Sequence, residues 1–358
     1  MQFGRRYTGL IDRFRDHLPV HDDTKLISLG EGNTPLIRLH NVPKWVGKDV
    51  DIYIKYEGLN PTASFKDRGM TMAVTKAVEA GSGAVICAST GNTSAAAAAY
   101  AARAGIKAFV IIPEGKIALG KLAQTMMYGA VILQIRGNFD QGMALVKQVA
   151  DAAQVTIVNS INPYRLQGQK TASFEIIEEL GFAPDFHCLP VGNAGNITAH
   201  WMGYKEYHDA GVVSRLPKML GYQAAGAAPF VAGGKVTHPD TLATAIRIGD
   251  PQSWEKAWTA QRESAGWFSA FSDELILEAQ ALLAQKEGIF CEPASAASLA
   301  GAMADIRSGK IPEGSKIVCT LTGHGLKDPD IAMKQSSCVK MSVIDPDLDA
   351  VKRIILDN

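Results

Sequence analysis

The chain has 358 residues, which is too long for one compact core and suits two domains of ordinary size. With 47% hydrophobic residues, 20% charged residues and 34 glycines, the composition is that of a globular α/β protein rather than a disordered or collagen-like one. The 36 basic and 36 acidic side chains give a net charge of zero, which argues against nucleic acid or an anionic membrane as the main partner.

The five cysteines stand singly, with no Cys-X-X-Cys pair and no histidine at metal-ligand spacing, so no disulfide framework and no metal site is expected. Residues 1–18 lack the apolar core of a signal peptide. No apolar run approaches the ~20 residues that a membrane-spanning helix needs. We therefore expect a soluble protein in the reducing cytoplasm.

From Gly47 onward, short β-branched runs alternate with amphipathic or alanine-rich stretches, a pattern that predicts parallel strands joined by crossover helices. The first set of strands is expected at 52–56, 84–88, 108–112 and 130–135, with helices at 64–80, 93–104, 116–128 and 139–153. The second set begins near Asn159, with strands at 185–191, 218–223, 267–270 and 316–321 and helices at 170–180, 197–207, 254–264, 273–286 and 294–306.

The predicted architecture is two open, twisted α/β sheets with helices on both faces. No low-complexity linker separates the two sets, so we expect a large interface between the lobes and a ligand site within it. Residues 226–240, rich in Gly, Ala and Pro, indicate a surface excursion, and residues 342–358 predict a strand and a short amphipathic helix.

The segment PTASFKDRG at 61–69 places Lys66 in the first turn of a helix, after an N-cap at Thr62 or Ser64. The partial positive charge at a helix N-terminus disfavours the ammonium form, so the Lys66 amine is well placed to act as a nucleophile and form a Schiff base. A lone lysine at a helix start is usually just solvated. The other motifs of the chain favour the chemical role.

Two turns that join a strand to a helix are candidate anion sites. In STGNTS at 89–94, backbone N–H groups and hydroxyls could receive an amino-acid carboxylate. In VGNAGN at 191–196, small residues would let the backbone approach a phosphate, while the absence of GxGxxG spacing disfavours a dinucleotide fold. Either turn could also be an ordinary capped connection without a ligand.

Near the end of the chain, CTLTGHG at 319–325 puts hydroxyls where a strand meets a glycine turn. Ligands gather at such carboxyl ends of strands in open α/β sheets. Thr322 could hydrogen-bond a neutral ring nitrogen. His324 could act as a base, although a lone histidine beside glycine is more often structural.

In their joint order, these motifs resemble those of the fold-type II, tryptophan synthase β-like, pyridoxal-phosphate enzymes, and most closely the threonine synthase family. The likeness runs from Leu29 to beyond His324 and includes EPASAAS at 292–298, while Ala63 stands where related sequences often carry Gly. The resemblance implies a large domain that binds pyridoxal 5'-phosphate at 1–52 and 158–358, a smaller mobile domain at 53–157, and a homodimer.

The resemblance also implies a role for each matching residue. Lys66 would be the catalytic Schiff-base lysine, Asn92 would contact the phenolic oxygen of the cofactor, and Thr322 would face its pyridine nitrogen. The cofactor phosphate would lie against Gly192, Asn193, Ala194, Gly195 and Asn196. The substrate would be bound by Ser89, Thr90, Asn92, Thr93, Asn159, Ser160 and Arg165. A planar guanidinium such as that of Arg165 can bind a phosphate through two parallel hydrogen bonds.

The activity implied by the resemblance is the conversion of O-phospho-L-homoserine and water to L-threonine and phosphate, the last step of threonine biosynthesis. The reaction would combine a β,γ-elimination with an addition at Cβ, and freed Lys66 would carry the protons. This makes the chain a candidate carbon–oxygen lyase acting on a phosphate ester.

Three other functions stay open at this point. A threonine or serine dehydratase of the same fold would typically carry a run of glycines in the phosphate loop and Ser or Cys in place of Thr322. A cysteate synthase, which uses phosphoserine and sulfite, would also need a phosphate clamp such as Arg165. A non-catalytic relative is disfavoured because Lys66 and the phosphate loop are both present, although fold alone does not establish activity.

Overall fold

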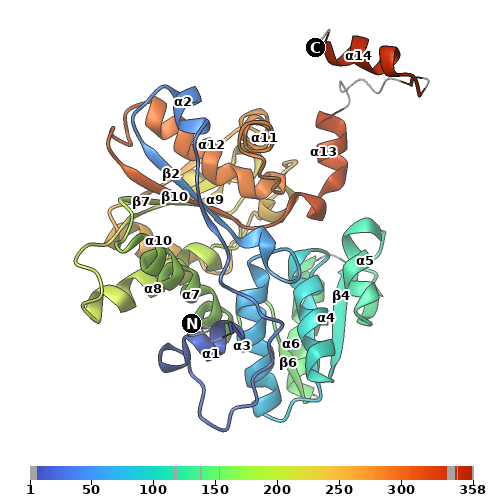
Figure 1. Ribbon diagram of the computed structural model, residues 1–358. Coiled ribbons are helices and arrows are strands. Elements are labelled where there is room, and N and C mark those ends of the chain that lie inside the picture. Colours follow the sequence, from blue (N-terminus) through green and yellow to red (C-terminus); the bar gives the residue numbers. More distant parts are fainter. Residues whose placement is uncertain are drawn as a thin grey trace.

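The computed structural model describes residues 6–115, 119–137, 139–152, 154–336, 343–344 and 346–356. Within these residues the chain forms two sheets, which belong to the two lobes seen in Figure 1. One sheet has six strands in the order β1-β2-β10-β7-β8-β9, and the other has four in the order β5-β4-β3-β6. The described pairings are parallel except for the antiparallel pairing of β1 with β2. The predicted α/β class is therefore confirmed.

The six-stranded sheet is covered on both faces. Its strands are β1 (Leu36–Arg38), β2 (Asp51–Tyr56), β7 (Phe186–Pro190), β8 (Lys218–Ala224), β9 (Trp267–Phe271) and β10 (Lys316–Leu321). One face packs against α2 (Val42–Val46), α11 (Asp273–Leu282) and α12 (Pro293–Arg307). The other face packs against α1 (Leu10–Arg13), α7 (Pro163–Leu180), α8 (Gly195–Asp209) and α10 (Trp254–Glu263).

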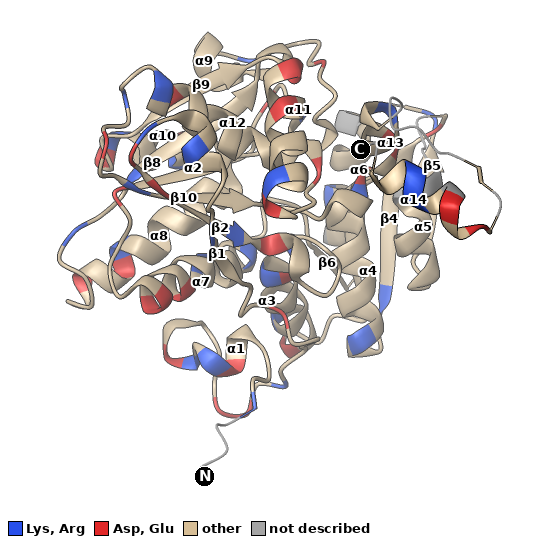
Figure 2. Ribbon diagram, turned by 45° about the horizontal axis from the view of Figure 1, so that its top comes forward, with Lys and Arg blue, Asp and Glu red and all other residues tan. Residues whose placement is uncertain are grey.

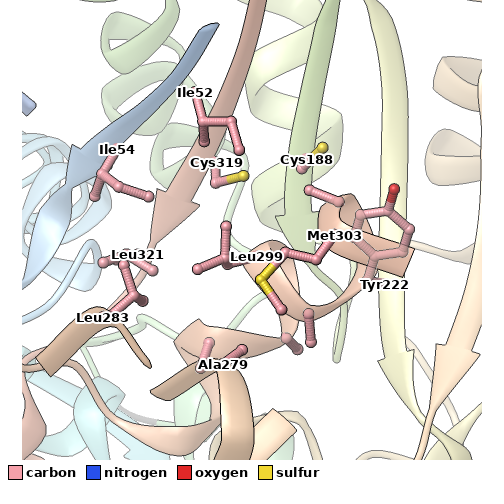
Figure 3. Close-up of a cluster of buried hydrophobic side chains, with 14 of the residues drawn as sticks. Ile52, Ile54, Cys188, Tyr222, Ala279, Leu283, Leu299, Met303, Cys319 and Leu321 are labelled. Atoms are coloured by element: carbon pink, nitrogen blue, oxygen red, sulfur yellow. The ribbon is translucent and has the colours of Figure 1, made fainter. Parts of the chain in front are cut away.

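The core on the α12 side follows from the alternation of side chains along each strand. Figure 3 shows Leu299 and Met303 of α12 close to Cys188 and Cys319, which lie on the neighbouring strands β7 and β10. All four side chains are nearly inaccessible to solvent. The next residue of β7, Leu189, faces the opposite side of the sheet and joins the core beneath α8.

The four-stranded sheet belongs to the smaller lobe. Its strands are β3 (Ala84–Ala88), β4 (Lys107–Pro113), β5 (Val131–Ile135) and β6 (Val155–Ile157). Helices α3 (Lys66–Glu79), α4 (Asn92–Ala104) and α5 (Leu119–Met127) cover one face, and α6 (Phe139–Ala152) covers the other. The run of alanines at 95–99 in α4 is buried, and such short side chains let this helix pack closely against its neighbours.

The remaining helices lie outside these layers, at α9 (Pro229–Ala232), α13 (Pro329–Gln335) and α14 (Leu348–Leu356). Helix α14 stands apart from both sheets in Figure 1. Acidic and basic residues are interspersed over the helices drawn in Figure 2, in keeping with the equal numbers of each in the sequence. No helix in the described part of the chain combines the length and the apolarity that a membrane crossing requires.

The expected strands form, and the differences lie mainly at element ends and loops. Helix α7 begins at Pro163 rather than at residue 170, because Asn162 caps it by accepting a hydrogen bond from the backbone of Tyr164. The short strands β1 and β6 were not expected. The excursion at 226–240 contains α9, whose Phe230 is 2% exposed and stacks on Trp254 and Phe268.

Two further expectations concern the ends of the domains. The boundary drawn at 52/53 is wrong as a division between sheets, because β2 pairs with β10 through Tyr56 and the chain leaves the six-stranded sheet only there. The mobility of 53–157 stays a prediction. The start of the expected helix at 116 and the expected strand at 342 lie outside the described residues, and residues 343–344 form no strand.

A buried ionic network joins the two lobes. Arg68 of α3 contacts Glu57 through Nε and Glu175 of α7 through Nη2, both at 2.6 Å. Lys55 of β2 contacts the same Glu175 carboxylate at 2.7 Å. Burial alone would raise the pKa of Glu175, but the charges of Arg68 and Lys55 hold it below the ordinary value. The network therefore pairs two basic side chains with two acidic ones in the interior.

Substitution of Glu175 tests how much this network contributes to stability. Glu175→Gln keeps the shape but leaves Arg68 and Lys55 without one buried counter-charge. We expect a loss of about 3–5 kcal/mol in the free energy of unfolding, measured with urea. The control is Glu313→Gln, which removes the exposed partner of Lys48 and should lose less than about 1 kcal/mol. Equal losses in the two variants would contradict a stabilising role of the network.

Candidate active site

The candidate site lies where segments from both sheets meet at the carboxyl ends of strands. The segment before α3 and the turn after β10 are joined by an antiparallel bridge between Ser64 and Gly323. The backbone N–H of Phe65 donates to the carbonyl of Thr322 at 2.8 Å, and that of His324 donates to the carbonyl of Ala63 at 3.0 Å. These bonds hold the lysine segment beside the turn that carries Thr322.

Lys66 is the first residue of α3, and the residue at the N-cap position is Phe65, which makes no side-chain cap. The expectation that Thr62 or Ser64 occupies that position is therefore wrong. The Ser64 hydroxyl does accept a hydrogen bond from the Lys66 backbone at 3.3 Å. Thr62 instead donates to the Asp67 carboxylate through its hydroxyl and its backbone N–H, at 2.7 and 3.0 Å. Asp67 thereby fixes the loop that leads into the helix.

Two alanines in the predicted cofactor loops adopt left-handed backbone conformations. Ala63, before the lysine, has φ of 66°, and Ala194, in the loop after β7, has φ of 62°. Residues with a Cβ rarely occupy this region, and glycine adopts it more easily. The conformation gives a physical reason why a glycine fits position 63 in related sequences. Strain of this kind is frequent at ligand-binding sites.

The amine of Lys66 is electrostatically unusual. Burial and, to a lesser extent, the positive charge of Arg165 lower its pKa to about 7, while the carboxylate of Glu292 opposes the shift. The Nζ atom lies 4.0 Å from the centre of the Phe65 ring. The lowered pKa favours the uncharged form of the Lys66 amine, which is the form that can attack a carbonyl carbon.

Arg165 lies in the first turn of α7 and is 2% exposed. Its Nη1 donates to the Val158 carbonyl at 3.2 Å, while its buried Nε has no hydrogen-bond partner. Burial lowers its pKa to about 10, and the nearby Cys87 thiol stays neutral because burial raises its pKa to about 12. Among the described residues no carboxylate lies within ion-pair distance of this guanidinium. A buried cation without a counter-charge is costly, so this position favours an anionic ligand.

Two of the other residues predicted to bind the substrate, Asn159 and Ser160, lie near Arg165 in the sequence. Asn159 is buried, accepts a hydrogen bond from the N–H of Ala88 at 3.1 Å and donates to the carbonyl of the same residue at 3.0 Å. Its amide therefore holds the end of β3. Ser160 is partly buried. Contact of either residue with substrate stays a prediction.

The turn between β3 and α4 leaves a helix N-terminus without a side-chain cap. Helix α4 begins at Asn92 after Gly91, and the Ser94 hydroxyl donates to the Gly91 carbonyl rather than accepting from the helix. Ser89, Thr90 and Thr93 are partly buried around this turn. Uncapped N–H groups at a helix start favour a carboxylate or a phosphate.

The turn between β7 and α8 also leaves a helix N-terminus without a side-chain cap. Helix α8 begins at Gly195, and its N-cap Ala194 supplies no side chain to cap it. The carbonyl of Asn193 accepts from the Ser253 backbone at 3.1 Å, and the Asn196 amide donates to Gln169 at 3.2 Å, so both residues are tied to neighbouring elements. A Cβ on Gly192 would lie 3.1 Å from the Cα of Ile246. Tight packing behind the loop and uncapped N–H groups in front fit the phosphate of pyridoxal phosphate.

Thr322 is 4% exposed, and its hydroxyl lies 2.9 Å from that of Ser295. Such a hydroxyl pair can serve a neutral ring nitrogen as donor or acceptor. His324 accepts a hydrogen bond from the Leu326 backbone through Nδ1 at 3.2 Å and stacks on Tyr56, which supports its structural interpretation.

Two residues of the site had no predicted role, Glu292 and Ser295 at the start of α12. Glu292 is 4% exposed and accepts from the Asn92 amide, while Ser295 contacts Thr322. The segment EPASAAS, already noted for its family likeness, was the signal that could have indicated them. Nothing local in that segment shows that it meets α4 and the turn after β10.

The lowered pKa of Lys66 can be tested on the protein without cofactor. The labelling rate of its amine by an amine-reactive reagent, followed by mass spectrometry of peptides, should rise through pH 7 and level off above pH 8. A lysine in a short unstructured peptide, with its pKa near about 10.4, should show a rate that still rises at pH 9. The same pH profile for both amines would contradict the shift.

The comparisons with known proteins agree with this geometry. The family model described as pyridoxal-phosphate dependent enzyme matches residues 27–323. A threonine synthase of Synechocystis sp. is 58% identical, covering 97% of this chain and 91% of its own. A threonine synthase of Mycobacterium tuberculosis is 59% identical over 95% and 94%, and one of Methanocaldococcus jannaschii is 51% identical over 96% and 86%.

Solved structures support the fold. Maize serine racemase superimposes with a TM-score of 0.75 at 22% identity, covering 92% of this chain and 98% of its own. The processed form of threonine deaminase isoform 2 from Solanum lycopersicum gives a TM-score of 0.73 at 20% identity, covering 93% and 90%. At this identity the likeness concerns the fold alone. From the family match and the close relatives together, the chain belongs to the pyridoxal-phosphate dependent enzymes and, within them, to the threonine synthase family.

Proposed function

We propose that the chain converts O-phospho-L-homoserine and water to L-threonine and inorganic phosphate, with pyridoxal phosphate attached to Lys66. One observation carries this proposal for the site: the buried guanidinium of Arg165 has an Nε without a hydrogen-bond partner, and its charge adds to burial in lowering the pKa of the Lys66 amine. Arg165 has no carboxylate partner among the described residues, and a phosphorylated amino acid would supply the missing anion. The family membership supports the same reaction.

The residues present fit the attachment point, the phosphate and the ring nitrogen of pyridoxal phosphate. Lys66 would hold it covalently, the uncapped start of α8 would bind its phosphate, and the hydroxyls of Thr322 and Ser295 would face its ring nitrogen. The chemistry that the cofactor supplies is an electron sink for the substrate carbon that carries the amine. Neutral hydroxyls at the ring nitrogen would leave that nitrogen unprotonated.

Lys66 would act as the base of the reaction. Its amine, whose pKa is lowered to about 7, can take the proton from Cα of the substrate and then a proton from Cβ. The C–O bond at Cγ breaks and phosphate leaves with the bonding electrons. A proton is then added at Cγ, water adds its hydroxyl at Cβ, and a proton returns to Cα. The sum is one ester and one water converted to threonine and phosphate.

Arg165 and the start of α4 would orient the substrate by its two anionic groups. The guanidinium would bind the phosphate and stabilise the charge that grows on it as the C–O bond breaks. The uncapped N–H groups around Asn92 and Thr93 would receive the carboxylate. The phosphate site and the carboxylate site come from different elements. A substrate whose phosphate and carboxylate reach both sites would be held with its Cα close to Lys66.

The assay that tests this function compares substrates. Purified protein with pyridoxal phosphate should release threonine and phosphate in equal amounts from O-phosphohomoserine, and Lys66→Ala should release neither. Ammonia from L-threonine or L-serine would instead indicate a dehydratase, and a product from phosphoserine with sulfite would indicate a cysteate synthase. Inactivity toward O-phosphohomoserine in a protein that binds the cofactor would overturn the proposed substrate.

Arg165→Ala tests the phosphate contact. Without the buried guanidinium that would bind the substrate phosphate, kcat/KM for O-phosphohomoserine should fall by about 30-fold or more. The matched control is Arg103→Ala, because Arg103 is exposed on α4, and it should keep the activity of the parent protein. A similar, small effect of both substitutions would rule out Arg165 as the phosphate ligand.

We also propose a cytoplasmic homodimer. Support for a second copy comes from the resemblance and from apolar side chains of α14 that are exposed in the single chain, among them Leu348 (66%) and Ile355 (68%). Support for the reducing compartment comes from the cysteines, which stand singly in the sequence and show no disulfide framework. Light scattering should give twice the chain mass of 38.3 kDa, and a monomer mass would contradict the dimer.

A further inference from the structure

Glu292 is a buried acid at the edge of the site, and its side chain accepts hydrogen bonds from Asn92 of the other lobe. It stands at the N-cap position of α12, where a polar side chain often caps the helix, yet it makes no such cap. It is 4% exposed, and among the described residues no basic group lies within ion-pair distance of it. Burial raises its pKa, and the hydrogen bond from Asn92 and the charge of Lys327 oppose this effect.

The backbone and its neighbours aim this carboxylate at α4. The N–H of Glu292 donates to the Gly323 carbonyl at 3.1 Å, so the residue is fixed to the turn that also pairs with Ser64. A Cβ on Gly323 would lie 2.5 Å from Oε1 of Glu292. Only glycine at 323 leaves room for the carboxylate in this position, and from there the side chain extends toward Asn92.

Both carboxylate oxygens of Glu292 lie 3.2 Å from Nδ2 of Asn92, which donates to them. The two residues belong to different lobes, since Asn92 opens α4 and Glu292 precedes α12. An amide has two N–H donors and one carbonyl acceptor. The carboxylate engages the NH₂ end and so decides which way the amide plane faces, while the rest of the group stays available to a ligand.

We propose that Glu292 is a positioning residue, whose carboxylate holds the Asn92 amide across the two lobes in the orientation needed to contact the cofactor. This inference rests on the proposed function, because it takes Asn92 to be a cofactor ligand. The hydrogen bond between Asn92 and Glu292 thereby contributes to cofactor binding. It can form only when the two lobes are placed relative to each other as they are in this structure.

The test is a double-mutant cycle on cofactor affinity. Apoprotein of the parent, Asn92→Ala, Glu292→Ala and the double variant is titrated with pyridoxal phosphate, and the dissociation constant is read from the absorption of the bound cofactor. Each single substitution should weaken binding about tenfold, in line with a hydrogen bond to a charged group. Because Glu292 acts through Asn92, the double variant should bind no more weakly than either single variant.

Two further variants separate positioning from a general effect on folding. Glu292→Gln keeps an acceptor oxygen and should weaken binding less than Glu292→Ala, and its cycle with Asn92→Ala replaces the first if Glu292→Ala does not fold. Asp305→Asn is the matched control, since Asp305 is a buried acid on the same helix that accepts from Tyr222 and Trp267, both at 2.7 Å. It should lower the thermal unfolding midpoint and leave cofactor affinity unchanged.

Two results would overturn the inference. If the effects of Asn92→Ala and Glu292→Ala multiply to about a hundredfold in the double variant, Glu292 acts independently of Asn92. If Glu292→Ala lowers only the unfolding midpoint, as the control does, its role is structural. In both cases a parent protein that binds the cofactor and makes threonine leaves the proposed function intact. A parent protein that binds no cofactor would overturn the proposed function and this inference together.

Discussion

The buried ion network around Arg68 determines where the reactive lysine lies. Arg68 follows Lys66 by less than one turn of α3, and its guanidinium is held by Glu57 and Glu175. The residue between them, Asp67, is bonded to the loop before the helix. Successive residues in the first turn of α3 therefore fix the helix to α7, to Glu57 in the turn after β2 and to its own loop, and the Lys66 side chain is left to face the site.

Two buried arginines in this region show how the same group can stabilise a fold or bind a ligand. Arg68 lies between two carboxylates, which compensate its positive charge. Among the described residues, Arg165 donates to the Val158 carbonyl, and its buried Nε has no hydrogen-bond partner. The protein keeps the second guanidinium uncompensated beside Lys66, where it depresses the pKa of the amine. A substrate phosphate at that position would supply the counter-charge only while substrate is bound.

Periodicity and motifs predict a large part of this structure. Most strands of the two sheets follow from β-branched runs, although β1 and β6 were not expected. The loops around Lys66, Asn92, Gly192 and Thr322 were expected at one edge because ligands gather at the carboxyl ends of parallel strands. The early start of α7 could also have been read from Asn162 and Pro163, which form a favourable helix start. Its effect is to place Arg165 on a helix, whose packing then buries it.

Other features are inaccessible to local reasoning. Arg68 and Glu175 are separated by 107 positions, and Asn92 and Glu292 by 200, so neither pair leaves a trace in the spacing of the sequence. The domain boundary at 52/53 was misplaced within β2 because the membership of this strand in the larger sheet depends on pairing with β10, near the other end of the chain. Left-handed φ at Ala63 and Ala194 is equally invisible, since alanine gives no sign of such a conformation.

The central claim is that Lys66, among the lysines of the chain, holds the cofactor. Lys327 is the alternative attachment site to compare, because burial also lowers the pKa of its amine. The carboxylates of Glu292 and Asp67 oppose that shift. Borohydride reduction of the protein with bound pyridoxal phosphate fixes the cofactor to its lysine, and digestion followed by mass spectrometry identifies the peptide. The account predicts the label on the peptide that contains Lys66. A label on Lys327, or on no lysine, would contradict it.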